Sequence, residues 1–119
     1  MNDLSRELID METLERVAPI IRNTAHPLRL RILDYLQAEG EPRTVSEIVA
    51  NSGGAEQAVV SQQLRILRDQ GILVAKRQGN YVFYDIQDRS VLMLLGCIRQ
   101  HQMRNTREPQ TAQTEGVAG

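Results

Sequence analysis

The 119 residues suit one domain, and no apolar run approaches the roughly 20 residues that cross a membrane. The single cysteine excludes an intrachain disulfide framework, and the acidic N-terminus is unlike a secretory signal, so we expect a cytoplasmic protein. The formal net charge is −1, but residues 1–56 hold six Arg and ten acidic residues, whereas residues 57–107 hold eight Lys or Arg and three Asp. The basic half permits nucleic-acid binding without establishing it.

The first amphipathic segment spans residues 3–24. Its apolar residues recur at helical spacing, which predicts a helix. Pro19 falls inside this pattern and predicts a kink or a break, because it removes a backbone donor and clashes with the preceding turn. The apolar stripe could pack on a partner subunit or on the chain's own domain, and the pattern leaves both alternatives open.

A boundary follows at residues 25–27 (AHP), since proline restricts the residue before it and suits the first turn of a helix. The next helix is predicted over residues 28–38, with Gly40 as its C-terminal stop. Arg29 and Arg31 lie about 160° apart around this helix, given 3.6 residues per turn. We expect both to be solvated.

A helix-turn-helix comes next. Thr44 and Glu47 match the capping box of a short helix, and residues 51–54 (NSGG) supply the turn. A longer helix then runs to about Gln70. Its predicted buried stripe consists of Val60, Leu64 and Leu67. A short capped helix, a glycine-containing turn and a longer second helix are the elements of a helix-turn-helix.

Two short β runs follow the stop at Gly71. Residues 72–77 (ILVAKR) and 81–86 (YVFYDI) alternate in strand fashion and are joined by residues 78–80 (QGN), which predicts a hairpin. A recognition helix followed by a basic hairpin is the plan of a winged helix. The sequence therefore predicts a mainly α fold with about five helices and a two-stranded wing.

The last helix is predicted from Val91 to about Arg104. Its first half, VLMLLGCI, is apolar all round and must be buried on both sides, for which a second subunit is the natural cover. The composition from Asn105 onward predicts a disordered tail over residues 105–119. Residues 1–104 would then form one DNA-binding and dimerisation domain.

Three stretches, in order and at suitable spacing, carry a family resemblance. They are residues 25–33 (AHPLRLRIL), residues 59–73 (VVSQQLRILRDQGIL) and residues 76–84 (KRQGNYVFY). They resemble the opening helix, the recognition helix with its exit, and the wing of the ArsR/SmtB winged-helix repressors. The resemblance covers roughly residues 11–102. It implies a homodimeric DNA-binding regulator, usually a repressor released by a metal or another small effector.

The resemblance also implies dimerisation through the first and last helices. The residues expected at this interface are Leu14, Val17, Ile21, Val91, Leu94, Leu95 and Ile98. The chain departs from the family pattern in its longer turn, in Gln63, which replaces the usual His, and in Glu56, which stands where a small capping Ser is common. We expect the entry into the recognition helix to differ in detail.

The outward side of the recognition helix and the hairpin carry the expected DNA contacts. Gln62 could pair with adenine, Arg65 could read guanine or bind phosphate, and Arg68 suits backbone phosphate. The expected recognition-helix residues are Gln57, Ala58, Ser61, Gln62, Arg65 and Arg68; those of the wing are Lys76, Arg77, Asn80 and Tyr81. The alternative for both sets is a solvated polar surface.

The effector is unknown. The helix before the turn has no cysteine, and the last helix offers only Asp88 and His101, with Ser90 and Arg104 at the companion positions. Two ligands per subunit do not complete a tetrahedral site, so we expect no metal and no cofactor. Cys97 is either a small apolar residue at the dimer interface or a thiol sensor. A reactive thiol needs a neighbour that lowers its pKa, and Arg99 is the one nearby residue in the sequence that could do so.

The sequence thus predicts a transcriptional repressor that binds a palindromic operator in double-stranded DNA as a homodimer, without the usual metal site. Alternatives are a thiol-responsive repressor that uses Cys97 and a protein-interaction module on the same scaffold. An enzyme is not expected, because no nucleophile and base can be paired and no glycine-rich phosphate loop is present.

Overall fold

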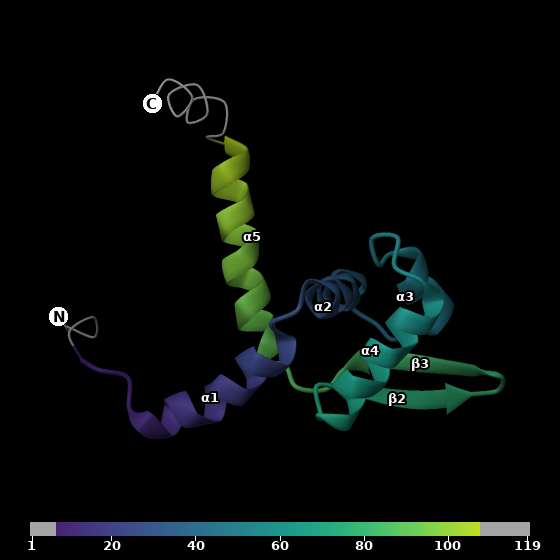
Figure 1. Ribbon diagram of the computed structural model, residues 1–119, viewed down its shortest axis with the longest axis horizontal. Coiled ribbons are helices and arrows are strands. Elements are labelled where there is room, and N and C mark those ends of the chain that lie inside the picture. Colours follow the sequence, from purple (N-terminus) through teal and green to yellow (C-terminus); the bar gives the residue numbers. More distant parts are fainter. Residues whose placement is uncertain (1–6, 108–119) are drawn as a thin grey trace.

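Five helices and a three-stranded antiparallel sheet make up residues 7–107, the part of the chain that the computed structural model describes (Figure 1). The elements are, in order, α1 (Met11–Thr24), α2 (Pro27–Glu39), β1 (Arg43–Thr44), α3 (Val45–Ala50), α4 (Gln57–Asp69), β2 (Leu73–Gln78), β3 (Tyr81–Ile86) and α5 (Val91–Arg107). The predicted fold, mainly helical with a winged helix-turn-helix, is confirmed. Within residues 7–107, no helix combines the length and the apolar character needed to cross a lipid bilayer.

Helix α1 begins later than its apolar pattern suggests. Asp10 is the N-cap, and its carboxylate accepts a hydrogen bond from the Thr13 N–H at 2.7 Å, so residues 7–10 are not helical. Of the two alternatives predicted at Pro19, a kink or a break, the break is wrong, since the helix continues through Pro19 to Thr24. Pro19 and Glu15 are both exposed, and water can therefore satisfy the Glu15 carbonyl that loses its donor.

Local signals set the ends of α2 and the start of α3, and α2 is one residue longer at each end than the predicted range of 28–38. His26 caps α2 by accepting the Leu28 N–H on its Nδ1, and Gly40 ends the helix in the left-handed region with φ 72°. The capping box at α3 is complete: the Glu47 N–H donates to Thr44 Oγ1 at 3.2 Å, and the Thr44 N–H donates to Glu47 Oε1 at 2.9 Å.

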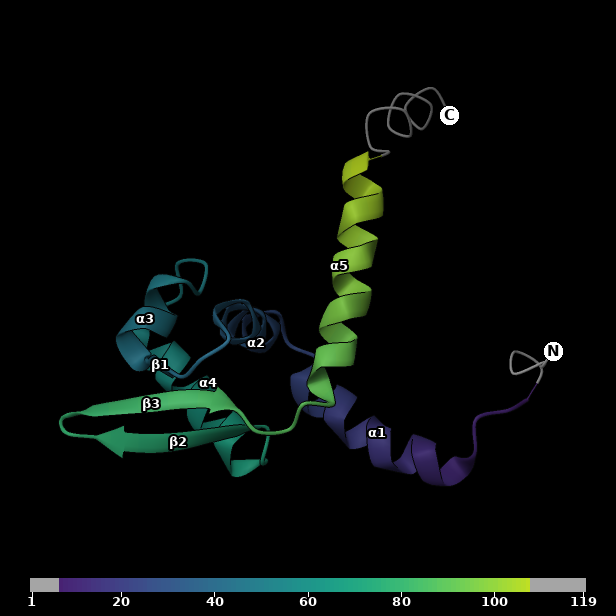
Figure 2. The ribbon, with the colours of Figure 1, turned by 180° about the vertical axis from the view of Figure 1, so that it is seen from behind.

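The hairpin β2–β3 joins a third strand that the sequence analysis did not predict. β1 is only two residues long and pairs with β3, which gives the strand order β1-β3-β2. Two residues are too few to show a strand pattern, so only the fold reveals this strand. Because β1 leads directly into α3, the helix-turn-helix is anchored to the wing (Figure 2).

The core lies between α2, α3, α4, the sheet and the first two turns of α5. α4 contributes Val60, Leu64 and Leu67, all fully buried as predicted. Both Figure 1 and Figure 2 show α1 and α5 extending away from this body, and they meet near the C-terminal half of α1. α5 continues to Arg107, three residues beyond its predicted end, and residues 108–119 of the predicted tail lie outside the described range.

The apolar first half of α5 is covered on one side only within the chain. Val91 and Leu95 are almost completely buried, whereas Met93 is 64% exposed and Ile98 is 44% exposed. Val91 and Leu95, which the sequence analysis assigned to a dimer interface, thus belong to the protomer's own core.

Candidate nucleic-acid interface

Helix α4 presents a polar face directly opposite its buried stripe. Ala58, Gln62 and Arg65 are exposed and follow one another at intervals of about one helical turn, on the side away from the core. Gln57 is exposed at the first turn, and Ser61 is half-buried at the edge of the face. The small side chain at Ala58 leaves the approach to Gln62 and Arg65 open. Such a face can meet the donors and acceptors of a DNA major groove.

At the C-terminal end of α4, Arg68 is paired with an acidic neighbour rather than being a free cation. Arg68 Nε and Nη2 donate to Asp69 Oδ1 at 3.3 and 3.2 Å. Asp69 is exposed and was not among the expected site residues. An exposed ion pair of this kind contributes little free energy, so Arg68 can exchange Asp69 for a phosphate at small cost.

The basic residues of the hairpin divide between its two faces. Lys76 pairs with Phe83 across the strands and Arg77 pairs with Val82, so their side chains lie on opposite sides of the sheet. Arg77 shares the side of the core residue Tyr84 but lies beyond the core, near the tip. Both Lys76 and Arg77 are exposed, as are the tip residues Asn80 and Tyr81. Strand alternation alone could have predicted this division.

The entry to α4 is built by a two-glycine turn rather than by a capping side chain. Gly53 and Gly54 have φ values of 68° and 88°, and the buried Ser52 hydroxyl donates to the Ile48 carbonyl at 2.5 Å. Glu56 is the N-cap residue, but its side chain makes no capping hydrogen bond. Its carboxylate is exposed, near the helix N-terminus where it favours the helix dipole.

A side chain expected to be solvated connects three helices. Arg29 Nε donates to Gln63 Oε1 on α4 at 2.6 Å, and Arg29 Nη1 donates to the Asn23 carbonyl in the last turn of α1 at 2.9 Å. The expectation that Arg29 is solvated is wrong, because the side chain is half-buried and its guanidinium is hydrogen-bonded to two protein acceptors. One acceptor lies 34 residues along the chain, and the other lies in the preceding helix. No local pattern could have indicated the bond to Gln63.

Arg43 holds the start of the helix-turn-helix. Its guanidinium pairs with Glu39 at 2.6 Å, Glu41 at 2.7 Å and Glu47 at 3.4 Å. Desolvation acts to lower the pKa of Arg43, but these three carboxylates raise it overall. The Thr44 N–H that donates to the Glu47 carboxylate, helped by Arg43, lowers the pKa of Glu47. These bonds fix α3 to the end of α2 and to β1.

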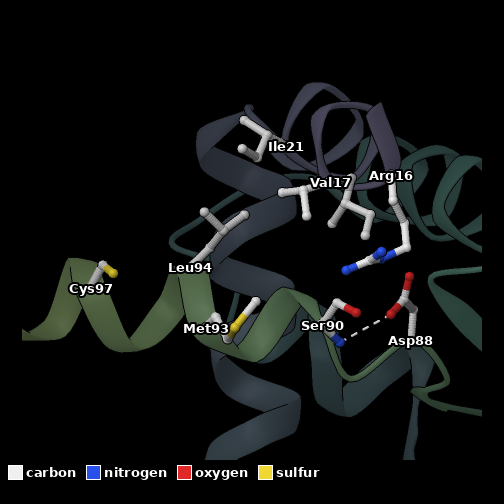
Figure 3. A pocket seen from close by; sticks show the side chains of 9 residues that line it. Arg16, Val17, Ile21, Asp88, Ser90, Met93, Leu94 and Cys97 are labelled. Atoms are coloured by element: carbon white, nitrogen blue, oxygen red, sulfur yellow. Dashed lines mark hydrogen bonds between the residues drawn. The ribbon is translucent and has the colours of Figure 1, made fainter. Parts of the chain in front are cut away.

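A cavity of about 290 Å³ lies between α1 and α5 (Figure 3). Val17 and Ile21 line it from α1, and Met93 and Leu94 from α5, all of them apolar. Asp88 lies at the opposite end of the cavity from Cys97. Of the apolar lining, Ile21 is 44% exposed and Met93 64% exposed, so an apolar surface on these two helices is open in the single chain.

The residues considered as effector ligands lie apart. Asp88 precedes α5, and its carboxylate accepts the Ser90 N–H at 3.0 Å. His101 lies about 15 Å along the helix axis from Val91, the first residue of α5, and contacts Asn105. Within the described part of the chain, no three His, Cys, Asp or Glu side chains come together as a metal would require. Cys97 is exposed. Arg99, the one cation expected to act on Cys97, instead pairs with Asp34 on α2.

A capped helix, a glycine turn, an outward-facing second helix and a basic hairpin together define a winged helix-turn-helix protein. A family model described as a helix-turn-helix domain matches residues 24–74, from the end of α1 into β2. The regulator NmtR of Mycobacterium tuberculosis is 37% identical over 87 residues, which cover 73% of this chain and 70% of NmtR.

Two solved structures are similar to the whole described fold. The antimony-specific transcriptional repressor AntR has a TM-score of 0.69 at 32% identity, covering 85% of this chain and 92% of AntR. The homodimeric winged helix-turn-helix domain Mb0332 of Mycobacterium bovis, described as a possible ArsR-family regulator, has a TM-score of 0.59 at 26% identity, covering 86% and 90%. The chain belongs to the ArsR/SmtB family of DNA-binding transcriptional regulators, a family of regulators rather than enzymes.

Proposed function

We propose that this chain is a cytoplasmic repressor that binds a palindromic operator in double-stranded DNA as a homodimer. The observation that carries the proposal is the exposed face of α4, where Gln62 and Arg65 stand directly opposite the buried stripe. If this face of α4 were only in contact with solvent, any polar residues would serve. This face combines a bidentate amide with a guanidinium one turn apart, the two groups that read adenine and guanine in the major groove.

The remaining basic residues would position the protein on the DNA backbone. Arg68 at the end of α4, and Lys76 and Arg77 in the wing, are exposed cations on segments next to the reading face. Contacts of this kind carry most of the salt-dependent affinity and no sequence information. Asn80 and Tyr81 at the wing tip would contact the flanking backbone or minor groove. Ala58 and Ser61 would permit close approach of the helix.

The proposed dimer covers the apolar surface of α1 and α5. Leu14, Ile21 and Ile98 are each 42–44% exposed in the single chain, and Met93 is more exposed still. Together with the half-buried Val17 and Leu94 they form one patch, defined here as the α1/α5 patch. The homodimeric state of Mb0332 supports a homodimer for this chain, and the exposed apolar surface supports its location on α1 and α5. Val91 and Leu95 would contribute by holding α5 on the body.

Footprinting and sedimentation test the two parts of the proposal separately. The purified protein should protect a two-fold symmetric sequence with half-sites about one helical turn apart, and the logarithm of its affinity should fall steeply with the logarithm of salt concentration. Analytical ultracentrifugation should give twice the chain mass. Protection of an asymmetric site by a monomer would contradict the dimer, and affinity independent of salt would contradict binding through the basic residues.

A thiol-responsive form of this repressor is the second candidate. The observation that favours it is the exposed position of Cys97 on the lining of the cavity between α1 and α5. Oxidation there would introduce a polar group beside the α1/α5 patch, next to Ile98. The pairing of Arg99 with Asp34 weakens this candidate, because a reactive thiol needs a nearby cation that is free to stabilise the thiolate.

A further inference from the structure

Arg29 bonds at once to the helix that would read DNA and to a helix that would form the dimer. The acceptor on α4 is the side chain of Gln63, next to Gln62, and the acceptor on α1 is the backbone carbonyl of Asn23. Asn23 lies two residues after Ile21, which belongs to the α1/α5 patch. Figures 1 and 2 both show α2, which carries Arg29, between α5 and the α3–α4 pair.

The chemistry of arginine makes this connection rigid. Nε and Nη1 belong to one planar guanidinium, so two hydrogen bonds from them fix the two acceptors relative to one another. The Gln63 bond, at 2.6 Å, is short and charge-assisted, and both side chains are half-buried, where water competes less. A rotation of α4 that moved Gln62 and Arg65 across the DNA would break it.

From this arrangement we propose that Arg29 is a positioning residue that sets the angle between the recognition helix and the dimerisation helix. In this role Arg29 acts through Gln63 and needs no contact with DNA. The inference rests on the proposed function, since an angle between these helices matters only in a dimer on a two-fold operator. In such a dimer the angle fixes the distance between the two reading faces, and therefore the half-site spacing that the protein accepts.

Spacing discrimination is the readout that separates positioning from mere stability. One base pair inserted at the operator centre displaces the half-sites by about 3.4 Å and about 35°. A dimer in which Arg29 holds α4 and α1 at a fixed angle loses affinity because of that mismatch. A dimer without this connection can change the angle and so loses less affinity. A variant that is only less stable, or that lacks a DNA contact, should lose affinity for both spacings by the same factor.

The experiment uses duplexes selected from a random-sequence pool by the wild-type protein, each with and without one inserted central base pair. The quantity measured is the affinity for the duplex without the insertion divided by the affinity for the duplex with it. This ratio should be at least about fivefold smaller for Arg29→Ala than for wild type, in line with the loss of a charged hydrogen bond. Gln63→Leu should lower the ratio similarly, and the double variant should lower it no further. Gln63→Glu, which keeps the acceptor, should retain the wild-type ratio.

Arg31→Ala is the matched control, because it removes the same charge from an exposed position on the same helix. It should leave the ratio unchanged, whatever it does to affinity. If circular dichroism shows that Arg29→Ala does not fold, the same ratio is measured for Gln63→Leu. Gln63 is only half-buried, so a leucine of similar size should be tolerated there. A wild-type ratio in the folded variant would overturn the positioning role alone. A wild-type protein that selects no two-fold sequence would overturn the proposed function and the inference that rests on it.

Discussion

Arg99 on α5 forms an ion pair with Asp34 on α2. The pair joins the long last helix to the same helix that carries Arg29, so α2 is bonded through side chains to both α4 and α5. Because Arg99 is two residues from Cys97, the pair also engages the guanidinium that could otherwise stabilise a Cys97 thiolate. Because the two side chains are 42% and 47% exposed, the pair contributes about 1 kcal/mol or less to stability, and its main consequence is where it holds the guanidinium.

Cys97→Ser tests the thiol-responsive candidate. With Arg99 engaged by Asp34, we expect the operator affinity of the wild-type protein to be insensitive to mild peroxide or persulfide, and the variant to behave identically. The measurement is a gel-shift titration of both proteins before and after oxidant. A loss of affinity in wild type that is absent in Cys97→Ser would establish Cys97 as the sensor and reverse our preference.

Ile21→Glu and Ile98→Glu test the α1/α5 patch. Burying an unpaired carboxylate in an apolar interface is unfavourable, and each variant also loses the part of the isoleucine side chain, 44% exposed in the single chain, that the dimer would bury. We expect the dimer dissociation constant to rise by at least about tenfold in each variant, as measured by sedimentation. Ala38→Glu, at an exposed position on α2 outside the patch, should leave the dimer intact. A monomer–dimer equilibrium that is unchanged in both isoleucine variants would place the interface elsewhere.

The elements that could be predicted from sequence are those whose signals are local. The Thr44–Glu47 capping box, the left-handed Gly40 and the buried stripe of α4 each depend on residues within one or two turns, and the structure contains all of them. A glycine or a capping side chain acts on its own backbone neighbours, so its effect does not depend on the rest of the fold.

What could not be predicted depends on contacts between distant segments. The bond from Arg29 to Gln63 spans 34 residues, and β1 exists only because β3 lies beside it. The apolar run at the start of α5 has no polar face from which its buried side could be read, so the burial of Val91 and Leu95 within the protomer appears only in the fold. For the expected DNA contacts, sequence and structure agree on exposure except at Ser61, which is half-buried, and the contacts themselves stay a prediction.

Arg65→Ala and Gln62→Ala test the reading face of α4. If either side chain pairs bidentately with a base, its removal should cost about 1–3 kcal/mol of operator affinity and relax the preference at that one base position. Selection of randomised operators by each variant measures both effects. Arg22→Ala, which removes an exposed charge from α1, is the control and should change neither. An unchanged base preference in the Arg65 variant would mean that Arg65 contacts only the backbone.

Arg68→Ala distinguishes a phosphate contact from a base contact. Each phosphate contact contributes about 0.9 to the slope of log affinity against log salt, so the variant should bind all sequences more weakly and show a slope smaller by about that amount. The release of Asp69 from its ion pair adds a free carboxylate near the DNA and should strengthen the effect. Asp69→Asn is the companion variant, and it should tighten binding without changing base preference. An unaltered slope for Arg68→Ala would exclude the phosphate contact.

Glu47 should make the stability of the helix-turn-helix depend on pH in the acid range. The Thr44 N–H, followed by Arg43, holds the pKa of Glu47 below its usual value in the folded state. A carboxylate whose folded pKa is depressed stabilises the protein above its unfolded pKa of about 4.3, and this contribution is lost as the pH falls through the folded pKa. Hydrogen bonding from Thr13 lowers the pKa of Asp10 in the same direction, so the acid loss has at least two sources.

Urea unfolding of wild type and Glu47→Gln between pH 7 and pH 3 separates these sources. Glutamine can still accept the Thr44 N–H but cannot titrate, so the variant should be less stable at pH 7 and lose less stability on acidification. Glu41→Gln, which removes a carboxylate that contacts Arg43 but caps no helix, is the control. Its acid dependence should follow that of wild type. Parallel pH profiles for wild type and Glu47→Gln would mean that the capping box does not carry the acid sensitivity.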